Sequence, residues 1–160
     1  MTLLRPLMLD LGAVAKGLAI DIAARELASF TGFAIDAGGD LFLGGCRPDG
    51  APWTVGIRHP RRDRELIDAV RVSNCAVCTS GDYERRSARD AGHHIIDARG
   101  GAPAAMLASV TVVAPTAMLA DALATAAFAL GPDEGIRLLE RHGVEGLLVT
   151  PTLQRYATRG

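Results

Sequence analysis

The 160-residue sequence is poor in cysteine and in aromatic residues, and it has no excess of charge of one sign. Three cysteines are too few for the disulfide framework of a small secreted domain. Basic residues number 17 against 18 acidic ones, so nothing in the balance favours binding to nucleic acid or to an anionic membrane. No run of about 18 uncharged apolar residues is present, and Arg5 interrupts the start too early for a signal-peptide core. We therefore expect a soluble, cytoplasmic chain with no nucleic-acid partner and no membrane segment.

Two of the cysteines, Cys75 and Cys78, have the C-x-x-C spacing of redox and zinc sites. The segment 69–78 reads as a β-strand, however, and side chains three positions apart on a strand point to opposite faces. A redox pair stands at the start of a helix, and a tetrahedral zinc site needs two further ligands. We interpret both cysteines as structural.

Hydrophobic residues make up 49% of the chain, which is enough for one packed core. The spacing of Val14, Leu18, Ile22 and Leu27 predicts a helix over 13–30 with these residues on one apolar face. The strongest helix is expected over 116–130, capped by Thr116 and stopped by Gly131-Pro132. The other expected elements are strands over 7–12, 33–36, 40–43, 53–58, 69–78, 93–97, 109–114 and 146–150 and a helix over 133–142. Together they predict a single α/β (α+β) domain over 1–160, with a mixed sheet and flanking helices.

Asp121 and Thr125 are candidates for a metal site because they stand four positions apart in the helix over 116–130. That spacing places both side chains on one face, one turn apart. A carboxylate in an otherwise apolar helix needs a partner, and carboxylate and hydroxyl oxygens suit a hard cation such as Mg²⁺. Alternatively, Asp121 is exposed and Thr125 bonds back to a helix carbonyl.

Two segments have features of ligand-binding turns. In the segment 10–17, helix-start N–H groups and Lys16 would attract phosphate, and Asp10 would accept hydrogen bonds from a ligand, although the P-loop spacing is absent. The alternative is a capped helix with a surface lysine. The segment 36–40 contains paired glycines that allow a tight turn and a close approach of the backbone. Its alternative interpretation is a hairpin turn without a ligand.

Two polar segments and one charged run complete the set of candidates. The segment 79–85 ends an apolar strand, and His94 in the segment 93–97 is a candidate acid, base or positioning residue. The histidines lack Cys or Glu at zinc-ligand spacing, so a structural role is the alternative. The basic run 58–64 is interpreted as a solvated loop between strands.

The order of these segments along the chain is more specific than any one of them. They read DLGAVAKG (10–17), DAGGD (36–40), WTVGIRHP (53–60), CTSGDYER (78–85), HHIID (93–97) and SVTVVAPTAMLADALATAAFALG (109–131). In this order, from about residue 9 to 150, the chain resembles the ApbE-type FAD:protein FMN transferases. The resemblance implies that family's fold, binding of FAD and Mg²⁺, and transfer of FMN from FAD to a threonine or serine hydroxyl of an acceptor protein, with release of AMP.

The resemblance also implies a metal site and a catalytic group. Asp121 and Thr125 match the family's metal-binding D-x-x-x-T, and Ala13 matches a residue that acts near the metal through its carbonyl oxygen. His94 matches the histidine of the family's H-I-x-D motif. His94 and Asp121 are the two candidates for the base that receives the proton of the acceptor hydroxyl.

The implied FAD site draws on several segments. Asp10 and Lys16 fall where the family contacts FAD, and Ile95 or Ile96 lies close to the flavin. The other residues that match FAD-binding positions are Gly38, Gly39, Asp40, Thr79, Ser80, Gly81 and Asp82.

The sequence departs from the family in two places. The segment 97–101 reads DARGG where D-P-x-T-G is typical, and the family's N-terminal third has no counterpart. Three hypotheses follow: an active transferase, a non-catalytic flavin-binding remnant, and a pyrophosphatase that cuts FAD into FMN and AMP with water as the acceptor. A truncated gene model, with the real start upstream of Met1, is a further alternative, and apolar surface left uncovered by the absent part would favour self-association.

Overall fold

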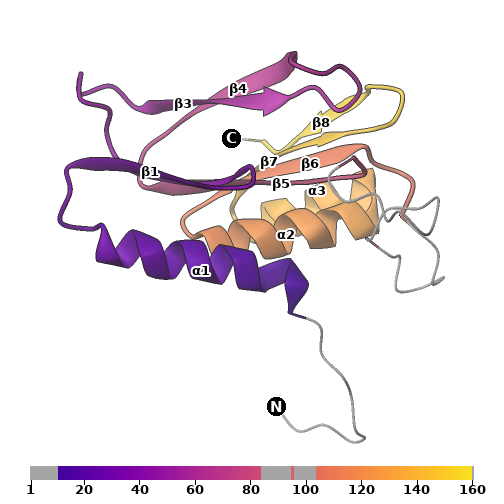
Figure 1. The fold of residues 1–160 in the computed structure, drawn as a ribbon. Helices are drawn as coiled ribbons and strands as arrows, with labels where there is room; N and C mark the ends of the chain where they lie inside the picture. Colours follow the sequence, from indigo (N-terminus) through magenta and orange to yellow (C-terminus); the bar gives the residue numbers. More distant parts are fainter. Residues whose placement is uncertain (1–10, 84–94, 96–103, 160) are drawn as a thin grey trace, which may run out of the picture.

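The computed structural model describes residues 11–83, 95 and 104–159 (Figure 1). The elements in chain order are α1 (Gly12–Glu26), β1 (Gly32–Ala37), β2 (Asp40–Gly45), β3 (Trp53–Arg58), β4 (Leu66–Val72), β5 (Cys75–Gly81), β6 (Ser109–Ala114), α2 (Ala117–Leu130), α3 (Pro132–Arg141), β7 (Glu145–Val149) and β8 (Arg155–Ala157). A six-stranded sheet in the order β1-β2-β5-β6-β7-β8 forms the middle layer. The helices cover one face of this sheet, and the β3–β4 hairpin covers the other (Figure 1).

The pairing in the six-stranded sheet is antiparallel from β1 to β8. The expected α/β class with flanking helices is confirmed. The sheet is antiparallel throughout the described strands, however, and not a mixture of parallel and antiparallel pairs. The β1–β2 turn contains Gly38 and Gly39 at φ 66° and 97°, a left-handed geometry that glycine adopts readily. Asp36 Oδ1 accepts a hydrogen bond from the Gly39 N–H at 2.9 Å, which closes the turn. The expected hairpin is therefore present, and it delivers Asp40 to the first position of β2.

Helix α2 lies in the middle of the core, as the sequence predicts. The Thr116 hydroxyl caps its first turn by accepting from the Leu119 N–H at 3.3 Å. Fully buried alanines, among them Ala117 and Ala120, let the helix backbone approach both the sheet and α1. Asp21 of α1 caps the same end, because its carboxylate accepts from the N–H groups of Ala117 at 2.7 Å and Met118 at 3.0 Å. In the part of the chain that the structure describes, no helix is long and apolar enough to span a membrane.

Helix α1 buries a different face from the one that its apolar spacing suggests. Its buried residues are Gly17, Ile20, Asp21 and Ala24, whereas Leu18 and Ile22 are 45% and 53% exposed. The reason is the short distance between α1 and α2: a Cβ on Gly17 would lie 2.4 Å from the Ala117 carbonyl oxygen. Small residues are therefore required at this contact. The helix also ends at Glu26 rather than at residue 30.

The single strand expected over 69–78 is wrong, because two strands of different sheets occupy this segment. β4 ends at Val72 and β5 begins at Cys75, and Asn74 between them has a φ of 54°. The Asn74 side chain accepts from the Gly45 N–H at 2.8 Å and so stabilises the reversal. β5 then continues to Gly81, through residues that we expected to interrupt it. The short strand β8 is an additional element that the sequence pattern did not indicate.

The two cysteines of the C-x-x-C spacing face opposite sides of β5, as predicted. Cys78 is buried in the core cluster beneath the helices. Cys75 packs with the cluster beneath the β3–β4 hairpin, together with Trp53 and Val55. The pair therefore cannot act as a joint redox or zinc site, and the structural interpretation is confirmed.

Replacing Gly17 by alanine tests the contact between α1 and α2. Helix propensity alone predicts that Gly17→Ala stabilises the protein by about 1 kcal/mol. We expect the opposite sign, a loss of roughly 1–3 kcal/mol, because the new Cβ overlaps backbone atoms of α2. Urea unfolding followed by circular dichroism measures the difference. The exposed Ala19 provides the control, since Ala19→Gly should lose about 1 kcal/mol from propensity alone. A more stable Gly17→Ala variant would contradict the close contact.

Candidate functional site

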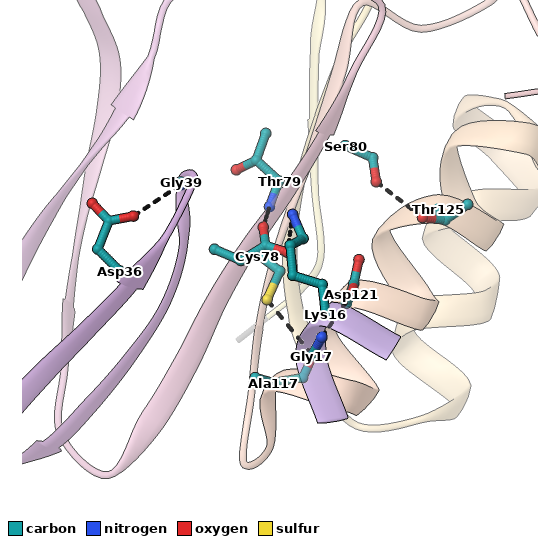
Figure 2. Close-up of polar contacts among 11 residues, drawn as sticks. Lys16, Gly17, Asp36, Gly39, Cys78, Thr79, Ser80, Ala117, Asp121 and Thr125 are labelled. Atoms are coloured by element: carbon teal, nitrogen blue, oxygen red, sulfur yellow. Dashed lines mark hydrogen bonds and ion pairs between the residues drawn. The ribbon is translucent and has the colours of Figure 1, made fainter. Parts of the chain in front are cut away.

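Most of the described candidate residues lie where four parts of the fold meet (Figure 2). These parts are the first turns of α1, the tip of the β1–β2 hairpin, the end of β5 and the middle of α2. Consecutive residues of α1, Lys16 and Gly17, contact the hairpin side and the α2 side respectively. The first half of α1 therefore joins two polar clusters into one site.

The first cluster is centred on Asp40, whose residue exposure is 1%. Its Oδ2 atom lies 2.6 Å from Lys16 Nζ, and its Oδ1 atom accepts from the Thr79 N–H at 3.1 Å. Burying a carboxylate is costly unless it is paired and hydrogen-bonded, and these contacts meet that requirement. Lys16 is the only lysine among the 17 basic residues, and its side chain stays 31% exposed. The Asp40 carboxylate of β2, which also binds the Thr79 N–H of β5, thus holds the partly exposed Lys16 ammonium group in place.

The second cluster is centred on Asp121, which is 7% exposed on the α1-facing side of α2. Its Oδ2 atom accepts from the Gly17 N–H at 3.1 Å. In a regular α-helix the Gly17 N–H points at the carbonyl oxygen of Ala13. The Asp121 carboxylate and the Ala13 carbonyl therefore face the same N–H group, which brings oxygens from two helices close together.

The hydroxyl of Thr125 extends this oxygen-rich cluster by one helical turn. Thr125 Oγ1 lies 3.1 Å from Ser80 Oγ, so α2 and β5 are joined by a hydroxyl pair. The neighbouring Thr79 points to the opposite face of β5, where its hydroxyl lies 2.9 Å from that of Thr111. Of the segment expected to bind FAD, Ser80 thus presents its side chain to the helix side, and Thr79 contributes its backbone N–H to Asp40.

The other candidates fall at the edges of these clusters or outside the described residues. Gly38 and Gly39 form the open tip of the hairpin, where an added Cβ would meet nothing within 4 Å. Gly81 ends β5 against the ring of Tyr83.

Ile95 is 5% exposed and belongs to the main core cluster. Asp10 and His94 lie outside the described residues.

A residue of the basic run 58–64, which was expected to be a solvated loop, reaches the same end of β5 and pairs with the candidate residue Asp82. Arg61 in the β3–β4 turn donates from Nη1 to Asp82 Oδ1 and from Nη2 to Asp82 Oδ2, both at 2.7 Å. These hydrogen bonds raise the pKa of the Arg61 guanidinium above its ordinary value. The pairing joins two sheets, so the basic run 58–64 is only partly a solvated loop.

The buried carboxylates also act on Cys78, which lies beside them on β5 (Figure 2). Burial raises the pKa of the Cys78 thiol well above its ordinary value, and the negative charges of Asp40 and Asp121 raise it further. The thiol is 3.7 Å from the Ala117 carbonyl oxygen, to which it donates. Cys78 is therefore a neutral packing group rather than a nucleophile.

The comparisons with known proteins agree on one family. The family model of the ApbE family matches residues 2–148. The chain is 33% identical over 152 residues to the FAD:protein FMN transferase of Vibrio cholerae, covering 91% of this chain and 46% of the relative. It is 39% identical over 169 residues to the FAD:protein FMN transferase of Treponema pallidum, covering 96% of this chain and 47% of the relative.

Solved structures show the same likeness in three dimensions. The ApbE protein of Thermotoga maritima superposes with a TM-score of 0.83 at 37% identity, over 94% of this chain and 51% of that one. The flavin transferase ApbE of Vibrio cholerae superposes with a TM-score of 0.80 at 31% identity, over 93% of this chain and 50% of that one. The chain therefore spans about half the length of the relatives that it matches.

The ion pair of Lys16 with Asp40 should contribute more to stability than an exposed ion pair. Lys16→Met leaves the carboxylate buried without its cation, and we expect a loss of about 1–3 kcal/mol, less than for a fully buried pair because Lys16 is partly exposed. Arg47→Met is the matched control, because the Arg47–Asp49 pair is exposed and should contribute about 0–1 kcal/mol. Urea unfolding measures both variants. Equal losses would show that Asp40 does not depend on Lys16.

The raised pKa of Cys78 predicts slow alkylation. A thiol reacts as the thiolate, so a raised pKa lowers the reactive fraction at any pH below it. We expect Cys78 to remain unmodified by iodoacetamide at pH 8 in the folded protein and to react in urea, with peptide mass spectrometry identifying the site. The half-buried Cys46 is the internal control. Modification of Cys78 at the rate of Cys46 in the folded protein would contradict the described environment.

Proposed function

The chain belongs to the ApbE family, and from this premise we propose that residues 1–160 form one domain carrying the FAD-binding and metal-binding half of an FAD:protein FMN transferase. The observation that carries the proposal is the contact between Gly17 N–H and Asp121 Oδ2, which brings the start of α1 onto α2. The oxygens near this contact would then lie beside Lys16, the residue that directly precedes Gly17 in α1. A cation site beside a partly exposed ammonium group is suited to a pyrophosphate.

The residues present fit Mg²⁺. Asp121 supplies a carboxylate, Thr125 a hydroxyl and Ala13 a backbone carbonyl, all hard oxygen donors of the kind that Mg²⁺ prefers. The Ser80 hydroxyl lies 3.1 Å from that of Thr125 and can accept its hydrogen, which would turn the Thr125 lone pairs toward the cation. When bound, Mg²⁺ supplies charge neutralisation at the pyrophosphate. Among the described residues there is no group of three or more His, Cys, Asp or Glu side chains that could hold a metal ion. A metal site here would therefore rely on carboxylate, hydroxyl and carbonyl oxygens together.

The chain's own residues then have separate tasks in the reaction. Lys16 binds the pyrophosphate oxygens as a point charge, and Asp40 holds the Lys16 ammonium group in place. The acceptor hydroxyl oxygen forms a bond to the FMN-side phosphorus, and the bond from that phosphorus to the bridging oxygen breaks, so that AMP leaves with the bridging oxygen. A base takes the hydroxyl proton. Asp121 already accepts from Gly17 and serves as a metal ligand in this scheme, which favours His94 as the base.

The implied partner is an acceptor protein that presents a threonine or serine hydroxyl. Leu11, directly before α1, and Leu18 and Ile22 of α1 are exposed at spacings that place them on one side of the helix, and they support self-association as a further property. The second candidate is a flavin-binding protein without catalysis. Hydrolysis of FAD by the same groups, with water in place of the protein hydroxyl, is the third.

Product analysis with an Asp121 variant tests the proposal. We expect an EDTA-sensitive FMN adduct on a threonine-containing acceptor domain incubated with the protein, FAD and Mg²⁺, together with released AMP. Asp121→Asn should lower the transfer rate by about a hundred-fold or more, because it removes the anionic ligand at the pyrophosphate. Mass spectrometry of the acceptor and chromatography of the nucleotides measure both products.

The exposed Asp133 at the start of α3 provides the matched control, and Asp133→Asn should leave the rate unchanged. AMP and FMN without an adduct would identify hydrolysis. Bound FAD without any product would identify the non-catalytic binder. A rate for Asp121→Asn equal to that of the unmodified protein would rule out the metal assignment.

A further inference from the structure

The end of β5 is held from the far side of the sheet by Arg61, a residue of the β3–β4 turn. The Arg61 guanidinium meets the Asp82 carboxylate in two parallel hydrogen bonds of 2.7 Å. Two-pronged, charge-assisted pairs of this kind fix orientation as well as distance. Asp82 directly follows Gly81, the last residue of β5, and its own N–H donates to the Ala108 carbonyl at 3.1 Å. The strand end is thus tethered both to β6 and to the hairpin on the other face.

A buried histidine shapes the turn that carries Arg61. His59 is 4% exposed, and its Nδ1 atom lies 3.1 Å from the backbone N–H groups of both Arg61 and Arg62, from which it accepts. Its own backbone N–H donates to the Glu65 carbonyl at 2.9 Å across the turn. A buried acceptor that receives two successive N–H groups leaves little freedom for the backbone between them. His59 therefore fixes the backbone of the turn from which the Arg61 side chain reaches Asp82.

The tether lies close to both clusters of the candidate site. Asp82 is two residues from Ser80, whose hydroxyl pairs with Thr125, and three residues from Thr79, whose N–H binds Asp40. A shift of the strand end would move these two contacts together. Both carboxylate oxygens of Asp82 accept from Arg61, so the position of Asp82 depends on the hairpin as well as on β5.

We propose that Arg61 is a positioning residue of the FAD site: preset by His59, it holds Asp82 and so sets Ser80 and the Thr79 N–H relative to Thr125 and Asp40. The proposal rests on the function proposed above. It assigns to the basic turn a role at the site without contact to the substrate. The effect of losing Arg61 should therefore fall on the geometry of the β5 end and on FAD affinity, and much less on global stability.

The test compares Arg61→Gln with Arg47→Gln, which breaks an exposed ion pair away from the site. We expect Arg61→Gln to weaken FAD binding in Mg²⁺ by about ten-fold, the size expected for one charge-assisted pair, and Arg47→Gln to leave it unchanged. Flavin fluorescence titration measures the affinity. Arg61→Lys, which keeps the charge without the two-pronged geometry, should give an intermediate affinity.

Amide hydrogen exchange provides a readout that does not depend on FAD. In Arg61→Gln, exchange at Thr79 and Asp82, whose N–H groups bond to Asp40 and Ala108, should become faster, with helix α2 unaffected. His59→Asn keeps an acceptor for the two backbone N–H groups and should behave like the unmodified protein, whereas His59→Leu should behave like Arg61→Gln. If His59→Leu fails to fold, Arg61→Gln decides alone.

The outcomes separate this inference from the proposed function. An unmodified protein that binds no FAD overturns the proposed function and, with it, the role of Arg61 in FAD binding, while the exchange data still decide whether Arg61 holds the strand end. FAD binding by the unmodified protein with equal affinity in Arg61→Gln overturns the positioning role. Unchanged exchange at Thr79 and Asp82 overturns the tether itself.

Discussion

The close contact of α1 with α2 at Gly17 is the constraint on which the rest of the structure depends. A side chain at this position would overlap the backbone of Ala117, so the two helices can meet at this distance only because Gly17 has none. The same contact lets the Gly17 N–H reach Asp121 and lets Asp21 cap the first turn of α2. Packing and polar contacts thus support each other: the alanines of α2 allow the approach, and the carboxylates fix the register of the two helices. The polar groups of the candidate site are placed by this register.

Three buried carboxylates, Asp21, Asp40 and Asp121, each accept hydrogen bonds from an element other than their own. A buried carboxylate without partners is strongly destabilising, so each of them ties the stability of the fold to the correct placement of two elements. The hydrogen bonds of Asp21 join the two helices. Asp40 binds Lys16 and Asp121 binds the Gly17 N–H, so both carboxylates hold the first half of α1 in place. The site therefore has a fixed arrangement of charge. Fixed charges of this kind need little reorganisation when a charged substrate binds.

The sequence predicts those parts of the fold in which local and tertiary preferences coincide. The helix over 116–130 has a capping threonine, a glycine stop and an alanine-rich face, and the strands over 53–58 and 109–114 have the bounds observed for β3 and β6. The buried face of α1 does not follow from its own pattern, because the need for Gly17 arises in the partner helix. Asp121 and Thr125 could be selected by spacing and by resemblance. Arg61 could not, since nothing in the run 58–64 distinguishes it from its neighbouring arginines before the two sheets are brought together.

Strand β5 explains how a residue on one face of the sheet can influence groups on the other. Alternation directs Thr79 toward the hairpin side and Ser80 toward the helices, so the two faces share one backbone. The strand is paired with β6 up to Gly81, and there the regular ladder ends. Beyond that point the position of the chain depends on the Asp82 contacts, and the strongest of these comes from the hairpin through Arg61. Thr79 and Ser80 are adjacent in the last part of this ladder, so a change in the position of the strand end should affect both the Ser80 hydroxyl and the Thr79 N–H. The hairpin layer, which lies on the opposite face from α1 and α2, is for this reason part of the structure that sets the geometry of the site.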